Sequence, residues 1–300
     1  GGRCQRSAPL APSPRARDEK NPMPARRGSA LSPWFLLSVV AASSVIGSVG
    51  SVSYGSECEE KSAKGKRPAS PATSAEPTTA AEQEGVVAVG NELRYSCSGV
   101  LVHPQAVLTA RHCLPATRIG LGPDAKQPRE SIAVREVRLP PDRRPDAALL
   151  LLARPLTDLV PISFRGKQES EPPAGEVVLI GYGGGPGGSY GKRRALEASI
   201  AGWGCDLLRS RFTGCNPELE LVLPRSRGFD TCDGDSGGPM LEREDCRLRL
   251  LAITSRPIAQ YRLRCGDGGV YVRLDALAPW LESELARLRA TADPSAASKP

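Results

Sequence analysis

The segment at residues 234–239, Gly-Asp-Ser-Gly-Gly-Pro, is the part of this 300-residue chain most clearly built for chemistry. A serine hydroxyl is a weak nucleophile at neutral pH and has to be exposed and activated by a base. The glycines around Ser236 permit a tight turn that presents its hydroxyl group. We expect the N–H groups of Gly234 and Ser236 to form the oxyanion hole, where they would stabilise the negative oxygen that appears when a carbonyl is attacked.

His112 is the candidate for the base that activates this serine. The chain has two histidines, and His103 precedes a proline in a predicted turn, which favours a structural or surface role. His112 differs because it follows the apolar run at residues 106–109 and directly precedes Cys113. An imidazole ordinarily titrates close to neutral pH, so it can both accept a proton and return it.

Asp146 is the candidate for the acid that orients the histidine. It opens the apolar run at residues 147–152, which would draw it towards the interior, where its carboxylate needs a partner. His112 would be that partner, and the carboxylate would hold the imidazole in one tautomer. Asp142 is the nearby rival, but the proline and arginine beside it indicate a solvated loop. We therefore favour Asp146.

Three segments together resemble the motifs of the trypsin/chymotrypsin family. They are Thr-Ala-Arg-His-Cys at residues 109–113, Asp-Ala-Ala-Leu-Leu at residues 146–150 and Asp-Gly-Asp-Ser-Gly-Gly-Pro at residues 233–239. The order His, Asp, Ser is that of this family and differs from the order in subtilisins or α/β-hydrolases. The resemblance extends over roughly residues 85–290.

The resemblance implies an all-β fold of two six-stranded antiparallel barrels with a C-terminal helix. It also implies a serine endopeptidase of the secreted bacterial type, acting on protein or peptide substrates through an acyl-enzyme. His112, Asp146 and Ser236 would be its catalytic triad. No cofactor or metal is expected, since two histidines without a His-Glu-x-x-His motif leave little for a zinc site.

The same resemblance suggests cleavage after arginine or lysine. Asp230 stands six residues before the serine, at the position that forms the floor of the S1 pocket in trypsin-like members. Its alternative role is that of an acid in a surface loop. Ser255, expected also to support the triad aspartate, and Gly269 would line the pocket. Arg256 and Pro257 stand where the family usually has tryptophan and glycine.

Nine cysteines are many for a chain of this size and indicate an oxidising compartment. The resemblance implies two bridges, Cys97–Cys113 and Cys232–Cys265. Cys205–Cys215 is the first choice for a third, which leaves Cys246 free or paired with Cys58. The pairing of these last four cysteines stays open at the level of sequence.

One departure from the family concerns activation. Members are usually activated by cleavage before an Ile-Val-Gly-Gly type sequence, whose new amino group pairs with the acid beside the serine, here Asp235. No such sequence precedes Val86. Either maturation uses another site, or Asp235 is satisfied otherwise, or the enzyme is weakly active. The alternative function is a non-catalytic, envelope-tethered pseudoprotease that acts as a binding protein.

The positive charge of the chain is confined to its N-terminal part. The net charge is +7, but residues 1–67 hold 11 basic and 5 acidic residues, so the rest is nearly neutral. Nucleic-acid binding needs a concentrated basic face, which this distribution does not predict. We expect the protein to be a monomer that does not bind nucleic acid.

The N-terminal region has the pattern of a secretory signal peptide. Two arginines and an uncharged stretch with an apolar centre at residues 34–46 follow Met23. The alternative is an uncleaved membrane anchor, which would tether the protein to a membrane. Either reading places the protein outside the cell, in the periplasm or at the cell envelope. The expected organisation is an upstream artefact or disordered segment at 1–22, a signal peptide or anchor at 23–53, a disordered linker or propeptide at 54–84, the peptidase domain at 85–290 and a disordered tail at 291–300.

Short apolar runs separated by glycine and proline predict the strands of the β domain. Leucines spaced by three and four residues over 274–288 predict one helix, with Pro279 in its first turn. The expected strands are residues 85–89, 99–102, 106–109, 147–152, 177–180, 248–254 and 269–273.

Overall fold

The computed structural model describes residues 83–169, 173–185, 189–224, 231–244, 247–258, 265–266 and 268–292. All of them belong to one compact unit, Cys58–Pro300. The expected leader, most of the linker, Asp230, Cys58, Cys246 and nearly all of the C-terminal tail lie outside the described residues. Within the described part of the chain, no helix is long and apolar enough to cross a membrane.

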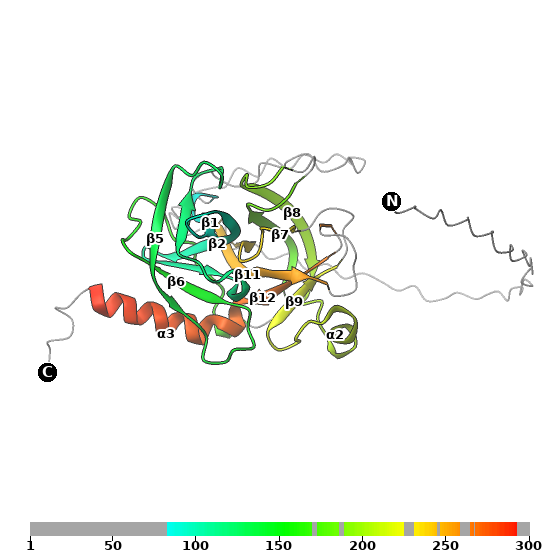
Figure 1. Ribbon diagram of the computed structural model, residues 1–300. Coiled ribbons are helices and arrows are strands. Elements are labelled where there is room, and N and C mark those ends of the chain that lie inside the picture. Colours follow the sequence, from blue (N-terminus) through cyan, green and yellow to red (C-terminus); the bar gives the residue numbers. More distant parts are fainter. Residues whose placement is uncertain are drawn as a thin grey trace, which may run out of the picture. The chain divides into compact units, whose positions relative to one another are not determined.

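The first half of the unit is a closed six-stranded barrel, drawn in cyan and green in Figure 1. Its strands run antiparallel to their neighbours in the order β1-β2-β3-β6-β5-β4. Their bounds are β1 Val86–Gly90, β2 Tyr95–His103, β3 Ala106–Thr109, β4 Arg118–Leu121, β5 Glu130–Arg138 and β6 Ala148–Leu152, with the 3-10 helix η1 Arg111–Cys113 after β3.

The second half is a six-stranded antiparallel sheet in the order β8-β7-β10-β11-β12-β9. Two helices and a second 3-10 helix accompany it. The bounds are η2 Lys167–Glu169, β7 Ala174–Gly181, β8 Arg194–Ala201, α2 Leu207–Thr213, β9 Glu220–Leu223, β10 Pro239–Glu244, β11 Arg247–Pro257, β12 Gly269–Arg273 and α3 Leu274–Ala292.

The apolar runs of the sequence are strands buried on both faces. In β6, Leu150 and Leu152 point into the first barrel, whereas Leu149 and Leu151 belong to a second cluster shared with the other sheet and with α3. A strand covered on both sides cannot alternate apolar with polar residues. This double burial explains why β6 is continuous leucine.

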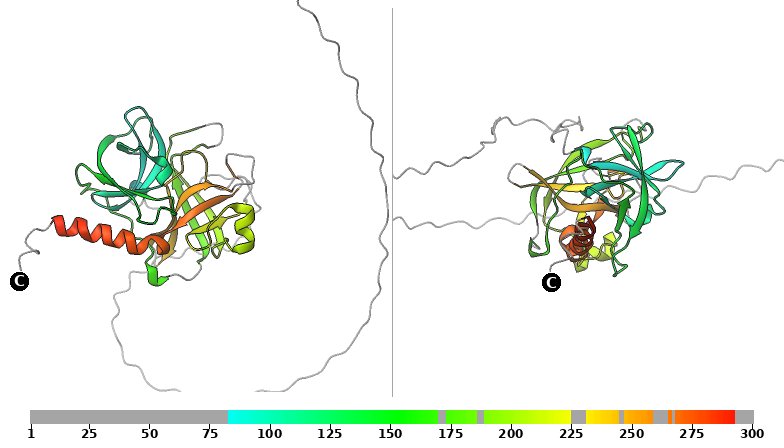
Figure 2. Two further views of the ribbon diagram at one scale, coloured as in Figure 1. Left: turned by 60° about the horizontal axis from the view of Figure 1, so that its bottom comes forward. Right: turned by 90° about the vertical axis from the view of Figure 1, so that its left-hand side faces the viewer.

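Helix α3 packs along the outside of the unit through the leucines that predicted it (Figures 1 and 2). It begins directly at the end of β12, so Pro279 lies in its second turn and the expected first-turn position is wrong. The cause is the early start at Leu274, where Asp275 in the first turn pairs with Arg273. The prediction of two six-stranded antiparallel units with a C-terminal helix is confirmed.

Candidate active site

The side chains of His112 and Asp146 meet at the edge of the first barrel. The His112 ring Nδ1 lies 2.7 Å from Asp146 Oδ2, and the His112 backbone N–H donates to Oδ1 at 3.0 Å. The pairing of β3 with β6 brings them together, because Thr109 faces Ala148 in the register. His112 follows the one strand and Asp146 precedes the other, so the carboxylate orients both the ring and the backbone of the histidine.

Asp146 is partly buried and receives a further hydrogen bond from the Ser255 hydroxyl, at 2.7 Å from Oδ2. Burial opposes ionisation of this carboxyl group. The hydrogen bonds from His112 and Ser255 outweigh that effect and lower the pKa of Asp146 to about 2. Asp146 is therefore a carboxylate throughout the pH range in which an imidazole can act as a base.

Asp142, the rival acid, has a different environment. Its carboxylate accepts hydrogen bonds from the backbone N–H and the guanidinium group of Arg144 at the surface. These bonds lower the pKa of Asp142, but they connect it only to its own loop. The geometry favours Asp146 as the partner of His112.

Ser236 lies in a turn whose glycines are required by the backbone. Gly234 has a φ of +99° and Gly237 a φ of +79°, which L side chains rarely adopt. A Cβ at Gly234 would lie 2.6 Å from the Tyr190 ring, and a Cβ at Gly237 would overlap the hydroxyl of Thr109. The turn is therefore closed against its neighbours and holds one shape.

Ser98 in β2 ties this turn to the first barrel. Its N–H donates to the carbonyl of Ser236 at 2.8 Å, and its hydroxyl donates to the carbonyl of Gly234, also at 2.8 Å. The Thr109 hydroxyl in turn donates to the Ser98 carbonyl at 2.7 Å. The serine turn and the strand that leads to His112 are thus bonded to the same residue.

His112 and Ser236 open onto one cleft of about 410 Å³. The side chain of His112 is 46% exposed, so its ring remains accessible from solvent. The remaining lining residues are Asn91, Arg94, Ser96, Cys97, Cys113, Leu114, Pro115, Asp233 and Gly234. A larger hollow of about 600 Å³ shares part of this wall but contains neither of the two candidate groups. The smaller cleft is therefore the candidate site.

Disulfides join Cys97 to Cys113, Cys205 to Cys215 and Cys232 to Cys265, which are the three expected pairs. The first fixes η1, and with it His112, to β2. Cys97, Cys113 and His112 are also close enough together to resemble a metal site. The two sulfur atoms are bonded to each other, so they are not available as the thiolates that a metal requires.

Asp235, the acid beside the candidate nucleophile, is buried in the second half of the unit. Burial raises its pKa, while the N–H groups of Cys232 at 2.8 Å and Gly183 at 2.7 Å stabilise its ionised form. Arg194 adds a positive charge nearby and donates to the carbonyls of Gly183 and Gly184. The carboxyl group thus has partners from the fold itself.

Of the expected S1 residues, Ser255 and Gly269 are among the described residues. The Ser255 hydroxyl in β11 donates to Asp146, and Gly269 in β12 pairs with Pro257 in β11. Asp230 lies outside the described residues. The pocket itself therefore stays a prediction.

Two residues of the site were not singled out for the roles that they take in the structure. Ser98 is fully buried in β2, but its segment Tyr-Ser-Cys-Ser-Gly carries no sequence signal for this role. In the sequence Arg256 stands out only as a departure from the family pattern, yet its guanidinium donates to the Ser255 hydroxyl at 3.2 Å. The sequence signal for this contact is that Arg256 directly follows Ser255, the serine expected to support the triad aspartate.

Comparison with known proteins decides the family. The family model described as Trypsin matches residues 73–281, which is more than half of the chain. The chain belongs to the trypsin family. A relative in this family is the vitellin-degrading protease of Bombyx mori, 28% identical over 216 residues that span 65% of this chain and 78% of the relative.

A solved serine protease structure is similar to this chain in fold. Neuropsin, a serine protease expressed in the limbic system of mouse brain, matches with a TM-score of 0.55 and 25% identity. The match covers 68% of this chain and 95% of neuropsin. The protein is thus a serine-type endopeptidase of the trypsin family.

Proposed function

We propose that this trypsin-family enzyme cleaves peptide bonds with Ser236 as nucleophile, His112 as general base and Asp146 as the acid that orients the base. The observation that carries the proposal is the 2.7 Å contact between His112 Nδ1 and Asp146 Oδ2, on a cleft shared with Ser236. The contact leaves Nε2 as the nitrogen that would receive the serine proton.

In the proposed mechanism, the Ser236 hydroxyl oxygen attacks the substrate carbonyl carbon while its proton moves to His112 Nε2. Asp146 stabilises the imidazolium that forms. The protonated imidazole then gives its proton to the leaving amine, and the C–N bond breaks to leave an acyl-enzyme. A water molecule, deprotonated by His112, then attacks the acyl-enzyme carbonyl carbon. The ester bond breaks, the acid product leaves, and the proton returns to Ser236.

The N–H groups of Gly234 and Ser236 would stabilise the tetrahedral oxyanion. Support comes from the serine turn, in which the positive φ of Gly234 directs the backbone and Ser98 holds the carbonyls of both residues. Donors fixed before the reaction need no reorganisation when the charge appears, and one such donor contributes about 10²–10³ in rate.

For specificity we propose cleavage after arginine or lysine, with Asp230 at the floor of the pocket. A carboxylate in a desolvated pocket would favour a cationic side chain and reject a neutral one. Asp230→Ala should abolish the preference for arginine over alanine at the cleaved position, measured as a ratio of kcat/KM for matched peptides. A variant that keeps the preference would remove Asp230 from this role.

We also propose that the enzyme is secreted. Three disulfides are formed among the described residues, and such bonds persist in oxidising compartments. The apolar segment at residues 34–46 would act as the leader or as a tether. N-terminal sequencing of the protein recovered from the medium and from membranes would report whether that segment is removed.

Peptide hydrolysis by the folded full chain tests the enzyme assignment. Wild type should cleave protein substrates, and Ser236→Ala should lose about 10³-fold or more in kcat. Ser199→Ala, which removes an exposed hydroxyl from β8, is the matched control and should retain full activity. A folded, oxidised wild type that does not cleave peptides but still binds proteins would instead support the pseudoprotease alternative.

A further inference from the structure

Arg256 in β11 forms an ion pair with Glu220 and donates to two neutral acceptors beside the site. From β11 its guanidinium binds both carboxylate oxygens of Glu220 in β9, with Nη1 at 2.6 Å from Oε1 and Nη2 at 2.8 Å from Oε2. It also donates to the carbonyl of Gly214 at 2.7 Å and to the Ser255 hydroxyl at 3.2 Å. A planar guanidinium with five N–H donors is suited to such a set of acceptors.

The two contacts of the Ser255 hydroxyl agree on the direction of its proton. The Ser255 oxygen lies between Arg256 Nη1 and Asp146 Oδ2. A guanidinium can only donate a hydrogen bond, and an ionised carboxylate can only accept one. The hydroxyl therefore accepts from Arg256 and gives its single proton to Asp146.

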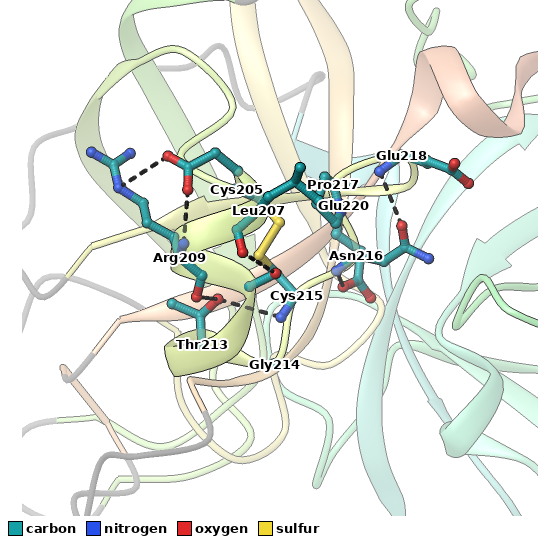
Figure 3. Close-up of a disulfide and its surroundings, with 12 residues drawn as sticks. Cys205, Leu207, Arg209, Thr213, Gly214, Cys215, Asn216, Pro217, Glu218 and Glu220 are labelled. Atoms are coloured by element: carbon teal, nitrogen blue, oxygen red, sulfur yellow. Dashed lines mark hydrogen bonds and ion pairs between the residues drawn. A yellow bond between two sulfur atoms is a disulfide. The ribbon is translucent and has the colours of Figure 1, made fainter.

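Glu220 holds Arg256 in place from the other side. Its side chain is only 5% exposed, and its Oε2 also accepts the backbone N–H of Asn216 at 2.7 Å. Figure 3 shows Asn216, in the loop after α2, and Glu220, the first residue of β9, near the Cys205–Cys215 disulfide. The backbone that holds Glu220 thus follows directly on a segment closed by a disulfide.

Arg256 and Glu220 form an ion pair beside the triad, while Arg94 and Asp233 line the cleft with His112 and Arg111 precedes it in η1. Among the described residues, the carboxylates that act on Arg256 are Glu220 and Asp146, and Asp146 in turn bonds to His112 and Ser255. Glu220 opposes the guanidinium charge at 2.6 Å, so that an arginine close to the site repels the imidazolium less. Loss of either partner would leave an unbalanced charge beside Asp146.

We propose that Arg256 is a positioning residue of the triad, which orients the Ser255 hydroxyl towards Asp146 while Glu220 neutralises its charge. The proposal rests on the proposed function, in which Asp146 orients the catalytic base. It connects the loop after α2 with the catalytic groups through Glu220, Arg256, Ser255 and Asp146. A purely structural role would only join β9 to β11 and would affect stability alone.

Three variants test the proposal: Arg256→Gln, Glu220→Gln and the double variant. Arg256→Gln should lower kcat about tenfold with little change in KM, because the support of Asp146 is lost. It should also move the acidic limb of the pH–rate profile to higher pH, by roughly half a pH unit, because Glu220 keeps its negative charge. Glu220→Gln should move the limb in the opposite direction, and the double variant should return it towards wild type.

The titration of the His112 ring, followed by NMR of histidine-labelled protein, gives a readout that does not depend on turnover. The chain has only two histidines, and a His103→Gln variant assigns the signals. The midpoints should shift with the same opposite signs as the acidic limbs. If wild type fails to cleave peptides while the midpoints shift, the proposed function fails and the positioning role stands.

Arg138→Gln is the matched control, because it also breaks an arginine–glutamate pair. Arg138 in β5 donates at 2.6 Å to the buried Glu284 in α3. It should leave both the profile and the histidine titration unchanged. Arg256→Lys covers the case in which the glutamine variant does not fold: it keeps the charge and the profile but should lower kcat. Folded Arg256 variants with wild-type kcat and titration would overturn the proposal.

Discussion

The N–H of Gly183 donates to the carboxylate of Asp235 at 2.7 Å, in the interior beside the proposed nucleophile. The carboxylate also binds the N–H of Cys232 at 2.8 Å. Of the three alternatives that the missing activation sequence left open, this geometry favours the one in which Asp235 is satisfied otherwise. The shape of the serine turn then depends on how closely Gly183 approaches it.

Gly183→Ala should therefore disturb the site. A Cβ at this position would overlap the Asp235 carboxylate. We expect a loss of about 1–3 kcal/mol in the free energy of unfolding, measured in urea, together with a large fall in activity. Gly184→Ala is the control, because its Cβ would make an ordinary contact at 3.6 Å with Cys232. Equal behaviour of the two variants would count against the close packing of Asp235.

Asp146→Asn should reduce kcat by about four orders of magnitude, because an amide does not hold the imidazole in the tautomer that the mechanism needs. The paired control is Asp142→Asn, which loses only the exposed contact with Arg144 and should stay within twofold of wild type. Steady-state kinetics of the two variants decide between the acids. A severe loss in Asp142→Asn with a mild one in Asp146→Asn would reverse the assignment.

The lowered pKa of Asp146 predicts how stability depends on pH. The folded pKa of about 2 lies below the ordinary value of 3.8 for an aspartic acid, so the stabilisation is fully present above pH 4 and is lost as pH falls towards 2. The corresponding contribution is roughly 2 kcal/mol. The difference in unfolding free energy between wild type and Asp146→Asn should shrink by that amount between pH 5 and pH 2. A difference that stays constant over this range would contradict the shift.

Removal of the Cys97–Cys113 bridge should weaken both fold and catalysis. Its 16-residue separation corresponds to about 3 kcal/mol of lost stability on the loop-entropy account. In the Cys97→Ser/Cys113→Ser double variant the urea midpoint should fall and kcat should drop, since η1 carries His112. An unchanged midpoint would show that the bridge is dispensable.

The strands that the sequence predicts lie in segments that are almost entirely buried, although the buried strand β9 was not among the predicted ones. All five residues of β1 and of β6 are buried, so each appears as an apolar run. Strands β5 and β8 escaped prediction because most of their side chains face solvent or are only partly covered. Helix α2 escaped for the same reason, since it is short and contains no buried residue.

The site shows a similar division. Ser236, His112 and Asp146 stand in short segments whose composition signals their chemistry, so the sequence is sufficient to propose them. The contacts of Ser98 with the serine turn, and of Arg256 with Glu220, join residues far apart in the chain. Such contacts depend on which strands become neighbours, and local composition does not encode that.

The most direct test of the account is covalent labelling of the oxidised wild-type protein with a fluorophosphonate, followed by peptide mapping by mass spectrometry. We expect one equivalent of the probe on Ser236, with labelling lost in Ser236→Ala and strongly slowed in His112→Ala and Asp146→Asn. Folded protein that takes up no probe, or that carries it on a different serine, would contradict the assignment of Ser236 as the nucleophile.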